Sequence, residues 1–222
     1  MSFYNEMFGD DGNARLCYFK YLEWLNAPEQ KNLIKRKEEA ENVFRRTGIT
    51  FNVYSEKEET EKLIPFDLIP RILTGDEWKI IQRGVEQRVK AINSFLWDIY
   101  HHQEIIKAGI IPRSLIEQNE AFLPEMIGFT PPSGIYTHIA GIDLVRTSEK
   151  EFFVLEDNVR TPSGVSYMIE NRETMYNMFP ELFSKIKVRS VTEYPRKAIE
   201  GFKKIFASII KRFYRSGANT WY

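Results

Sequence analysis

The pattern of apolar and polar positions predicts a chain that is helical in its first half. Apolar residues recur every three or four positions over residues 14–25 and 74–100, as they do along one face of an α-helix. The second of these helices opens with Thr-Gly-Asp-Glu, where Thr74 and Glu77 have the spacing of a capping box. Another helix is expected over residues 28–46, because its proline suits a first turn and a glycine follows its end.

Strands are predicted where the apolar spacing changes to two. Residues 49–54 alternate in this way, and two apolar-rich segments, residues 135–146 and 151–158, flank a polar turn. The fold class is therefore α+β, with helices first and a small antiparallel sheet near residue 140. The remaining predicted helices span residues 103–107, 112–118 and 195–215.

Acidic side chains meet in the hairpin that the last two strands would form. If its turn is centred on residues 149–150, Asp143 lies across from Glu156 and Gly141 across from Asn158. Opposed Cα atoms in such a hairpin are about 4.5–5.5 Å apart, and like charges directly opposite each other destabilise a sheet. A divalent cation between the two carboxylates would remove the repulsion, so the pattern predicts a metal site.

Mg²⁺ suits this predicted site best, because it binds to one or two carboxylates together with substrate phosphates. Asn158 adds a neutral oxygen for a second ion, and Glu156 is placed to bridge two ions about 3.5–4 Å apart. Asp157 points to the other face and is not expected to be a ligand. The alternative interpretation is a solvated hairpin end, and a register slip of one residue would remove the site.

The residues after the second predicted strand offer groups that bind phosphate. Arg160 carries a planar guanidinium fork that matches phosphate oxygens. Ser163, Gly164 and Ser166 offer hydroxyl and backbone N–H groups near the start of a helical segment, where anions bind favourably. Together with two metal ions, these residues predict a site for a polyphosphate.

Composition narrows the class of protein. The 222 residues are 43% hydrophobic and 28% charged with a formal net charge of zero, which is ordinary globular composition without the basic excess of a nucleic-acid binder. The single cysteine, Cys17, excludes an internal disulfide and suits a reducing cytosol; a helix-face position is expected for it. Because no signal-peptide pattern or apolar run of about 20 residues occurs, we expect a cytoplasmic protein without a membrane span.

Three blocks of sequence resemble a known family. They are "HIAGIDLVR", "FFVLEDNVRTPSGVSYMIENR" and the upstream "IPFDLIPRIL…EWKIIQRGVEQRVKAINSFLWDIY". They resemble the circularly permuted ATP-grasp proteins (type 2), relatives of glutathionylspermidine synthetase, over roughly residues 3–195. The resemblance implies that Asp143, Glu156 and Asn158 hold two Mg²⁺ on the phosphates of ATP.

The resemblance also implies a reaction and its partners. A small-molecule or peptide carboxylate would attack the γ-phosphate of ATP to give an acyl phosphate, and an amine would then displace phosphate to form an amide. Where glutathionylspermidine synthetase has an arginine ahead of its metal-binding aspartate, this sequence has Gly141. We expect Arg160 to take that role, with Arg146 or no residue as the alternatives. Arg71 and Arg88 either contact substrate or form structural ion pairs.

Three regions are expected along the chain: a mainly helical region at 1–128, a metal- and phosphate-binding hairpin and turn at 129–195, and a basic amphipathic helix and tail at 196–222. Family members continue further and carry their nucleotide-clamping lysines in that later part, so the resemblance implies an incomplete ATP-grasp fold. The leading hypothesis is the N-terminal portion of an ATP-dependent carboxylate–amine ligase. The alternative is a non-catalytic remnant or half of a split protein that needs a partner. The last helix is expected to be a domain helix, and the alternative is a helix that binds a membrane or partner.

Overall fold

A computed structural model describes residues 4–27, 32–54 and 59–215. The chain divides into two compact units. The first contains residues up to 78 together with 146–151 and 163–192, and the second contains residues 79–145, 152–162 and 193 onward. The mixture of helices with small antiparallel sheets confirms the predicted α+β class. The predicted boundaries at 128 and 195 stay a prediction.

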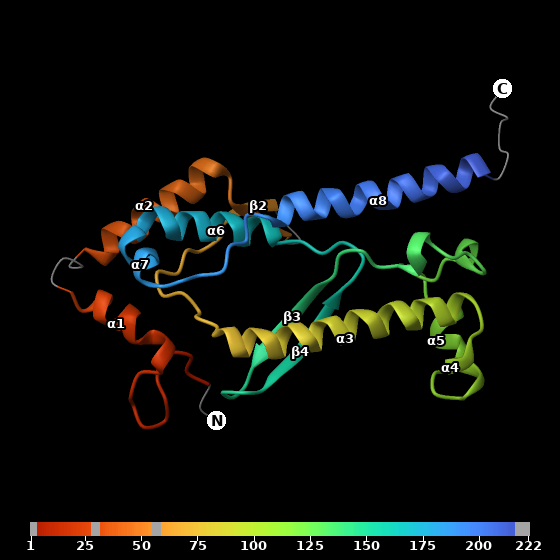
Figure 1. The fold of residues 1–222 in the computed structure, drawn as a ribbon, viewed down its shortest axis with the longest axis horizontal. Helices are drawn as coiled ribbons and strands as arrows, with labels where there is room; N and C mark the ends of the chain where they lie inside the picture. The colour runs from red at the N-terminus through yellow and green to blue at the C-terminus, as the bar shows by residue number, and fades with distance from the viewer. Residues whose placement is uncertain (1–3, 28–31, 55–58, 216–222) are drawn as a thin grey trace. The chain divides into compact units, whose positions relative to one another are not determined.

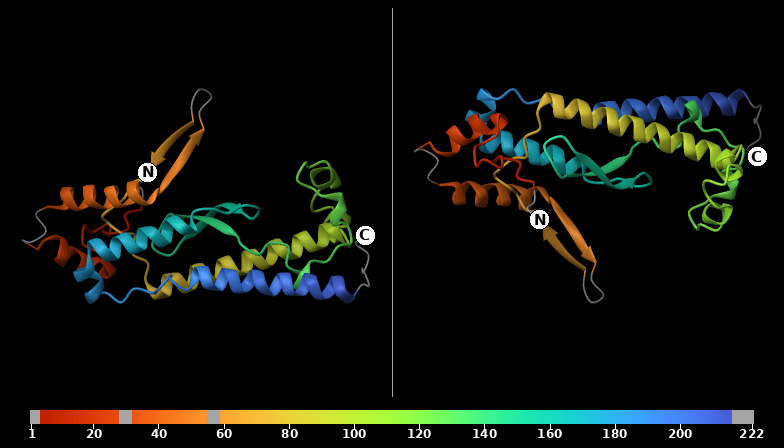
Figure 2. Two further views of the ribbon diagram at one scale, coloured as in Figure 1. Left: turned by 90° about the horizontal axis from the view of Figure 1, so that it is seen from above. Right: turned by 90° about the horizontal axis from the view of Figure 1, so that it is seen from below.

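The first unit is built mainly from helices and carries one hairpin, whose strands β1 and β2 pair from Thr50 opposite Leu63 to Tyr54 opposite Glu59. Figure 1 labels α1, α2, β2, α6 and α7 of this unit, and Figure 2 shows this hairpin extending away from α2. Its elements are η1 (Leu16–Tyr18), α1 (Phe19–Leu25), α2 (Leu33–Thr47), β1 (Thr50–Tyr54), β2 (Glu59–Leu63), α6 (Val165–Met178) and α7 (Pro180–Lys185).

An aromatic core holds the first unit together. Trp24 of α1 packs edge-on against Phe179, with ring centroids 5.0 Å apart, and Phe44 of α2 packs in the same way against Phe66 at 5.3 Å. These arrangements suit the ring quadrupoles and add to the hydrophobic gain from burial. The buried core residues of this unit are Tyr18, Tyr21, Trp24, Ala40, Phe44, Ile49, Phe66, Met175, Phe179 and Leu182.

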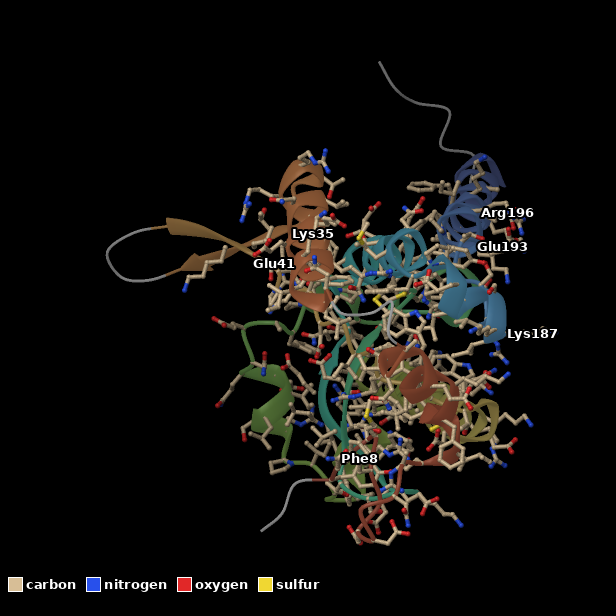
Figure 3. All side chains as sticks on the ribbon, turned by 90° about the vertical axis from the view of Figure 1, so that its left-hand side faces the viewer. Phe8, Lys35, Glu41, Lys187, Glu193 and Arg196 are labelled. Atoms are coloured by element: carbon tan, nitrogen blue, oxygen red, sulfur yellow. The ribbon has the colours of Figure 1, made fainter. Side chains whose placement is uncertain are left out.

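The charged surface of α2 is only partly a solvated face. Figure 3 shows Lys35 and Glu41 on this helix, and Lys35 is 66% exposed. Arg36, by contrast, donates from Nη1 to the carbonyl of Met178 at 2.8 Å and to Glu181 at 3.1 Å. Arg36 therefore belongs to the packing of the unit, because a guanidinium can bury its flat faces against aromatic rings while its N–H groups reach acceptors.

The second unit contains most of the longest helix and the hairpin of the predicted site. An aromatic stack supports it: Tyr100 lies 5.1 Å from Phe122 and 6.0 Å from Tyr136, between ring centroids. Its elements are α3 (Gly75–Tyr100, whose first turn belongs to the first unit), α4 (Glu104–Lys107), α5 (Arg113–Glu117), η3 (Pro124–Met126), η4 (Pro132–Gly134), β3 (Gly141–Arg146), β4 (Phe152–Asn158) and α8 (Tyr194–Arg215).

The long helix confirms the prediction from sequence, including its capping box. The N–H of Glu77 donates to the hydroxyl of Thr74 at 3.3 Å, and the N–H of Thr74 donates to the Glu77 carboxylate at 2.7 Å. The helix expected from residue 28 is observed from Leu33, where the Asn32 side chain accepts from the N–H of Lys35. Pro28 lies outside the described residues.

The first strand of the predicted site is shorter than expected. We predicted a strand over residues 135–146, but β3 begins only at Gly141. The reason is tertiary: the N–H groups of Tyr136 and Thr137 donate to Oδ1 of Asn93 on α3 rather than to a neighbouring strand. A short strand, β2, was missed because its sequence, Glu-Thr-Glu-Lys-Leu, is largely polar.

Candidate functional site

The hairpin of β3 and β4 brings two of the three predicted metal ligands together. Nδ2 of Asn158 donates to a carboxylate oxygen of Asp143 at 3.4 Å. A Cβ added to Gly141 would lie 3.5 Å from Cβ of Asn158. At this end of the hairpin, Gly141 and Asn158 are therefore neighbours, as the predicted register requires, and Asp143 and Asn158 point to the same face.

The turn end of the hairpin differs from the expected two-residue turn. The N–H of Thr147 donates to the carbonyl of Glu151 at 3.2 Å, so the loop contains three residues, 148–150. If pairing is counted from this bond, Asp143 lies opposite Leu155. If it is counted from the neighbouring pair Gly141 and Asn158, Asp143 lies opposite Glu156. The two ends differ by one residue, which is the mark of a β-bulge.

Exposure along β4 also departs from the pattern of a regular strand. Phe153 and Leu155 are 57% and 73% exposed, with Val154 half-buried between them. Glu156 is exposed as well, and Asp157 and Asn158 are half-buried. The alternation of a regular strand therefore breaks at Leu155–Glu156 and again at Asp157–Asn158. Among the described residues, the side chain of Glu156 has no hydrogen bond or ion pair, so its carboxylate is free to bind a ligand.

Asp157 has a separate structural partner. Nε and Nη2 of Arg88 on α3 donate to its two carboxylate oxygens, each at 2.6 Å. The hydrogen bonds from Arg88 lower the pKa of Asp157 and keep the carboxylate ionised. Of the two roles considered for Arg88, the structure therefore gives the ion pair, and Asp157 is occupied on the side away from the predicted ligands.

The donor set fits Mg²⁺ in kind. Asp143 and Glu156 offer carboxylates, Asn158 offers an amide oxygen, and hard cations prefer such oxygens. The Asn158 amide can present its oxygen by rotation, because its nitrogen and oxygen are interchangeable in shape. Within the described ranges, no three His, Cys, Asp or Glu side chains are grouped to hold a metal. A carboxylate pair with an amide leaves coordination positions for phosphate and water, as Mg²⁺ requires.

The predicted phosphate-binding residues fall in two places. Arg160 follows β4 in the second unit; it is exposed, and in the described part of the chain it makes no hydrogen bond or ion pair. Ser163, Gly164 and Ser166 belong to the first unit, where Gly164 precedes α6 with φ of 93°. Only glycine adopts this left-handed conformation readily. Ser163 and Ser166 are exposed at the start of α6.

Arg146 is excluded as the alternative to Arg160. Its side chain is 6% exposed, and its Nη1 and Nη2 donate to Glu6 at 2.9 Å and to Glu77 at 2.5 Å. Its Nε donates to the carbonyl of Ser148 at 3.0 Å. These bonds fasten the hairpin turn within the first unit. Arg71 likewise pairs with Glu6, at 3.3 Å.

Sequence reasoning missed the role of Asn93. Its Oδ1 accepts from the N–H groups of Tyr136 at 2.8 Å and Thr137 at 3.0 Å, and it thereby holds the segment that leads into β3. The available signal was a single amide on the helix face that otherwise carries Val89 and Leu96.

Comparison with known proteins places this arrangement in a family. A family model described as a circularly permuted ATPgrasp matches residues 70–211, which include α3, both strands of the hairpin and most of α8. This chain belongs to the circularly permuted ATP-grasp family. Among the described residues, no helix has the length and apolar character needed to cross a membrane.

Several curated proteins are similar to the chain. An uncharacterised protein of Synechocystis sp. is 40% identical over 199 residues, and one of Mycobacterium leprae is 40% identical over 205. These matches cover 90% and 92% of this chain but 41% and 36% of the relatives, so the chain spans well under half of their length. A Frankia alni protein named "Putative glutamate–cysteine ligase 2-3" is 36% identical over 182 residues, which cover 81% of this chain and 20% of that protein.

Proposed function

We propose that this chain supplies the metal- and phosphate-binding part of an ATP-dependent carboxylate–amine ligase. The observation that carries the proposal is the cluster of oxygen donors on the β3–β4 hairpin of a circularly permuted ATP-grasp protein. There Nδ2 of Asn158 lies 3.4 Å from a carboxylate oxygen of Asp143, and the Glu156 side chain has no hydrogen bond or ion pair among the described residues. The name of the Frankia alni relative, "Putative glutamate–cysteine ligase 2-3", supports the reaction class.

In this proposal Asp143, Glu156 and Asn158 hold two Mg²⁺. When bound, the ions would neutralise the negative charge of the ATP phosphates. Arg160 would present its fork to phosphate oxygens, since its guanidinium is exposed and has no partner in the described ranges. Ser163, Gly164 and Ser166 would offer hydroxyl and backbone N–H groups to phosphate at the start of α6.

The reaction proposed for the complete fold has two steps. A substrate carboxylate oxygen bonds to the γ-phosphorus of ATP, and the bond from that phosphorus to the bridging oxygen breaks, so that ADP leaves with the electron pair. An amine nitrogen then attacks the acyl carbon of the acyl phosphate. Inorganic phosphate leaves, the nitrogen loses a proton, and an amide remains. The acid and amine are a small-molecule or peptide carboxylate and amine, in keeping with the proposed relation to glutathionylspermidine synthetase.

A second candidate function is that of a component which binds nucleotide only when another polypeptide segment completes the fold. The observation that favours it is exposed apolar surface on the hairpin: Val145, Phe153 and Leu155 are 42%, 57% and 73% exposed. In folded proteins, contiguous surface of this kind marks a contact with another element. The occupant proposed here is the part of the relatives' length that this chain does not span.

Calorimetry of nucleotide binding tests the first proposal. We expect the 222-residue chain to bind a non-hydrolysable ATP analogue in the presence of Mg²⁺ and not in EDTA. Glu156→Gln should weaken this binding at least tenfold, because it removes a charged ligand. Glu149→Gln is the matched control, since Glu149 is an exposed acid in the turn of the same hairpin. Equal affinities of wild type and Glu156→Gln would contradict the metal site.

The same titration separates the two candidates. If wild-type chain binds only after a segment covering the remaining length of a relative is added, and Glu156→Gln abolishes that binding, the second candidate holds. If binding is absent under both conditions, neither function stands.

A further inference from the structure

Helix α3 contacts β4 and the segment that leads into β3. On β4, Asp157 receives two hydrogen bonds from Arg88, each 2.6 Å long. Ahead of β3, the N–H groups of Tyr136 and Thr137 donate to Asn93. Arg88 and Asn93 are five residues apart on one helix, which corresponds to about 7.5 Å along its axis. One helix therefore contacts both β4 and the segment that leads into β3.

The position of Asp157 makes this contact relevant to the ligands. Asp157 stands between Glu156 and Asn158 in sequence, and side chains of successive strand residues point to opposite faces. A two-point bond from Arg88 fixes the plane of the Asp157 carboxylate and with it the rotation of β4 about its own axis. Glu156 and Asn158 are thereby held toward the opposite face.

The bulge explains why such a fixed point is needed. The one-residue difference between the two ends of the hairpin interrupts the ladder that would otherwise align the strands, and a one-residue slip would turn every following side chain to the other face. On the β3 side, Asn93 also donates to the carbonyl of Val89 at 3.0 Å, so its amide is itself held to the helix. β4 and the segment that leads into β3 are thus each held by side-chain hydrogen bonds from α3, in addition to the backbone hydrogen bonds of the hairpin.

A contribution to the stability of the fold is a weak explanation for the ion pair of Arg88 with Asp157. The side chains of Arg88 and Asp157 are 45% and 24% exposed, and ion pairs with this much solvent contact add little to stability. A bidentate pair adds orientation as well as energy. We propose that Arg88 and Asp157, together with Asn93, are positioning residues that align Glu156 and Asn158 with Asp143 for metal binding. The inference rests on the proposed function, because it presupposes that these three side chains are ligands.

The test is Mn²⁺ binding by the full chain, with free Mn²⁺ measured by electron paramagnetic resonance. We expect Arg88→Met to raise the dissociation constant about tenfold, the size of effect usual when a residue supporting a metal ligand is lost. Arg88→Lys keeps the charge but loses the fork, so its constant should lie between those of wild type and Arg88→Met. Arg83→Met is the control: Arg83 is an exposed arginine on the same helix that makes no hydrogen bond or ion pair in the described residues.

The outcomes distinguish this inference from the proposed function. If Glu156→Gln weakens Mn²⁺ binding but Arg88→Met matches Arg83→Met, the positioning role is overturned and the metal site stands. If wild type does not bind Mn²⁺, or Glu156→Gln binds equally well, both fail. Should Arg88→Met not fold, Arg88→Lys decides: a constant equal to that of wild type overturns the role of the fork. Amide exchange of residues 152–158 gives a readout without metal, and it should accelerate in Arg88→Met but not in Arg83→Met.

Discussion

Arg146 shows how much one side chain can organise at the residue scale. Its guanidinium lies 4.6 Å from the ring centroid of Tyr4 and donates to Glu6, Glu77 and the carbonyl of Ser148. A buried guanidinium is tolerated only when its donors find acceptors, and here carboxylates supply two of them. The residue that sequence alone leaves as a candidate for phosphate binding is therefore an anchor of the hairpin turn.

Gly141 gives a prediction at the same scale. A Cβ at this position would lie 3.1 Å from Cβ of Pro162, closer than the usual 3.5–4.0 Å between carbons, and the proline ring cannot rotate away. We expect Gly141→Ala to lower the free energy of unfolding by about 1–3 kcal/mol through overpacking. Urea unfolding followed by circular dichroism measures this change.

Gly84 provides a control of the opposite sign. It lies within α3, and a Cβ there would meet no atom within 4 Å. Gly84→Ala should therefore stabilise the chain by about 0.5–1 kcal/mol, because alanine loses less backbone freedom in a helix. If both variants shift stability in the same direction, the close packing around Gly141 does not determine its identity.

At the scale of elements, Glu181 of α7 joins two other helices. One of its carboxylate oxygens accepts from Nε1 of Trp24 on α1 at 2.9 Å and from Nη1 of Arg36 on α2 at 3.1 Å. Glu181→Ala would leave the indole N–H of Trp24 unpaired in the core, which typically costs about 1–3 kcal/mol. Denaturant unfolding should show this loss. Glu181→Gln retains an acceptor and should lose less; an equal loss in both variants would mean that the hydrogen bond is not what matters.

The elements also show which parts of the fold are predictable. The long helix could be predicted with its cap, because the interaction of Thr74 with Glu77 is local in sequence. The start of β3 could not, because Asn93 is more than 40 residues away from the backbone that it binds. The one-residue difference between the two ends of the β3–β4 hairpin has no glycine in β4 or other local mark in the sequence.

The contact between Asp143 and Asn158 was predictable from the sequence, but the residues that support the hairpin were not. Spacing along the two strands sufficed to expect Gly141 across from Asn158, with Asp143 on the same face, since a hairpin has few possible registers. Nothing in that spacing indicates that Arg88 binds Asp157, because the pairing depends on where α3 lies. Candidate ligands can be predicted from the alternation of one strand, whereas a residue such as Arg88, which contacts that strand, comes from a separate element.

At the scale of the whole molecule, acid sensitivity follows from half-buried, hydrogen-bonded carboxylates. Burial alone would raise the pKa of Glu77 and of Glu181, but hydrogen bonds outweigh it: Thr74 and Arg146 donate to Glu77, and Trp24 and Arg36 to Glu181, so that both pKa values are lowered. A folded-state pKa below the unfolded value of about 4.3 stabilises the fold fully above that pH. The contribution is lost as the pH falls through the lowered folded-state values.

Thermal unfolding at two pH values tests this sign. Between pH 6 and pH 3.5 the midpoint of the wild type should fall further than that of the Glu77→Gln/Glu181→Gln variant, which has already lost both ionised groups. The exposed pair Glu23→Gln/Glu38→Gln serves as the control and should follow the wild type. An identical fall in the wild type and the first variant would show that these carboxylates do not govern acid stability.

The β3–β4 hairpin has one further consequence. In the described part of the chain, each of its strands has only the other as a neighbour, so each leaves an outer row of backbone donors and acceptors. Phe153 and Leu155 stand exposed along one of those rows. Such an edge templates the addition of a strand from another molecule. At high concentration, self-association of this chain would therefore begin at β4, on the same strand that carries Glu156 and Asn158.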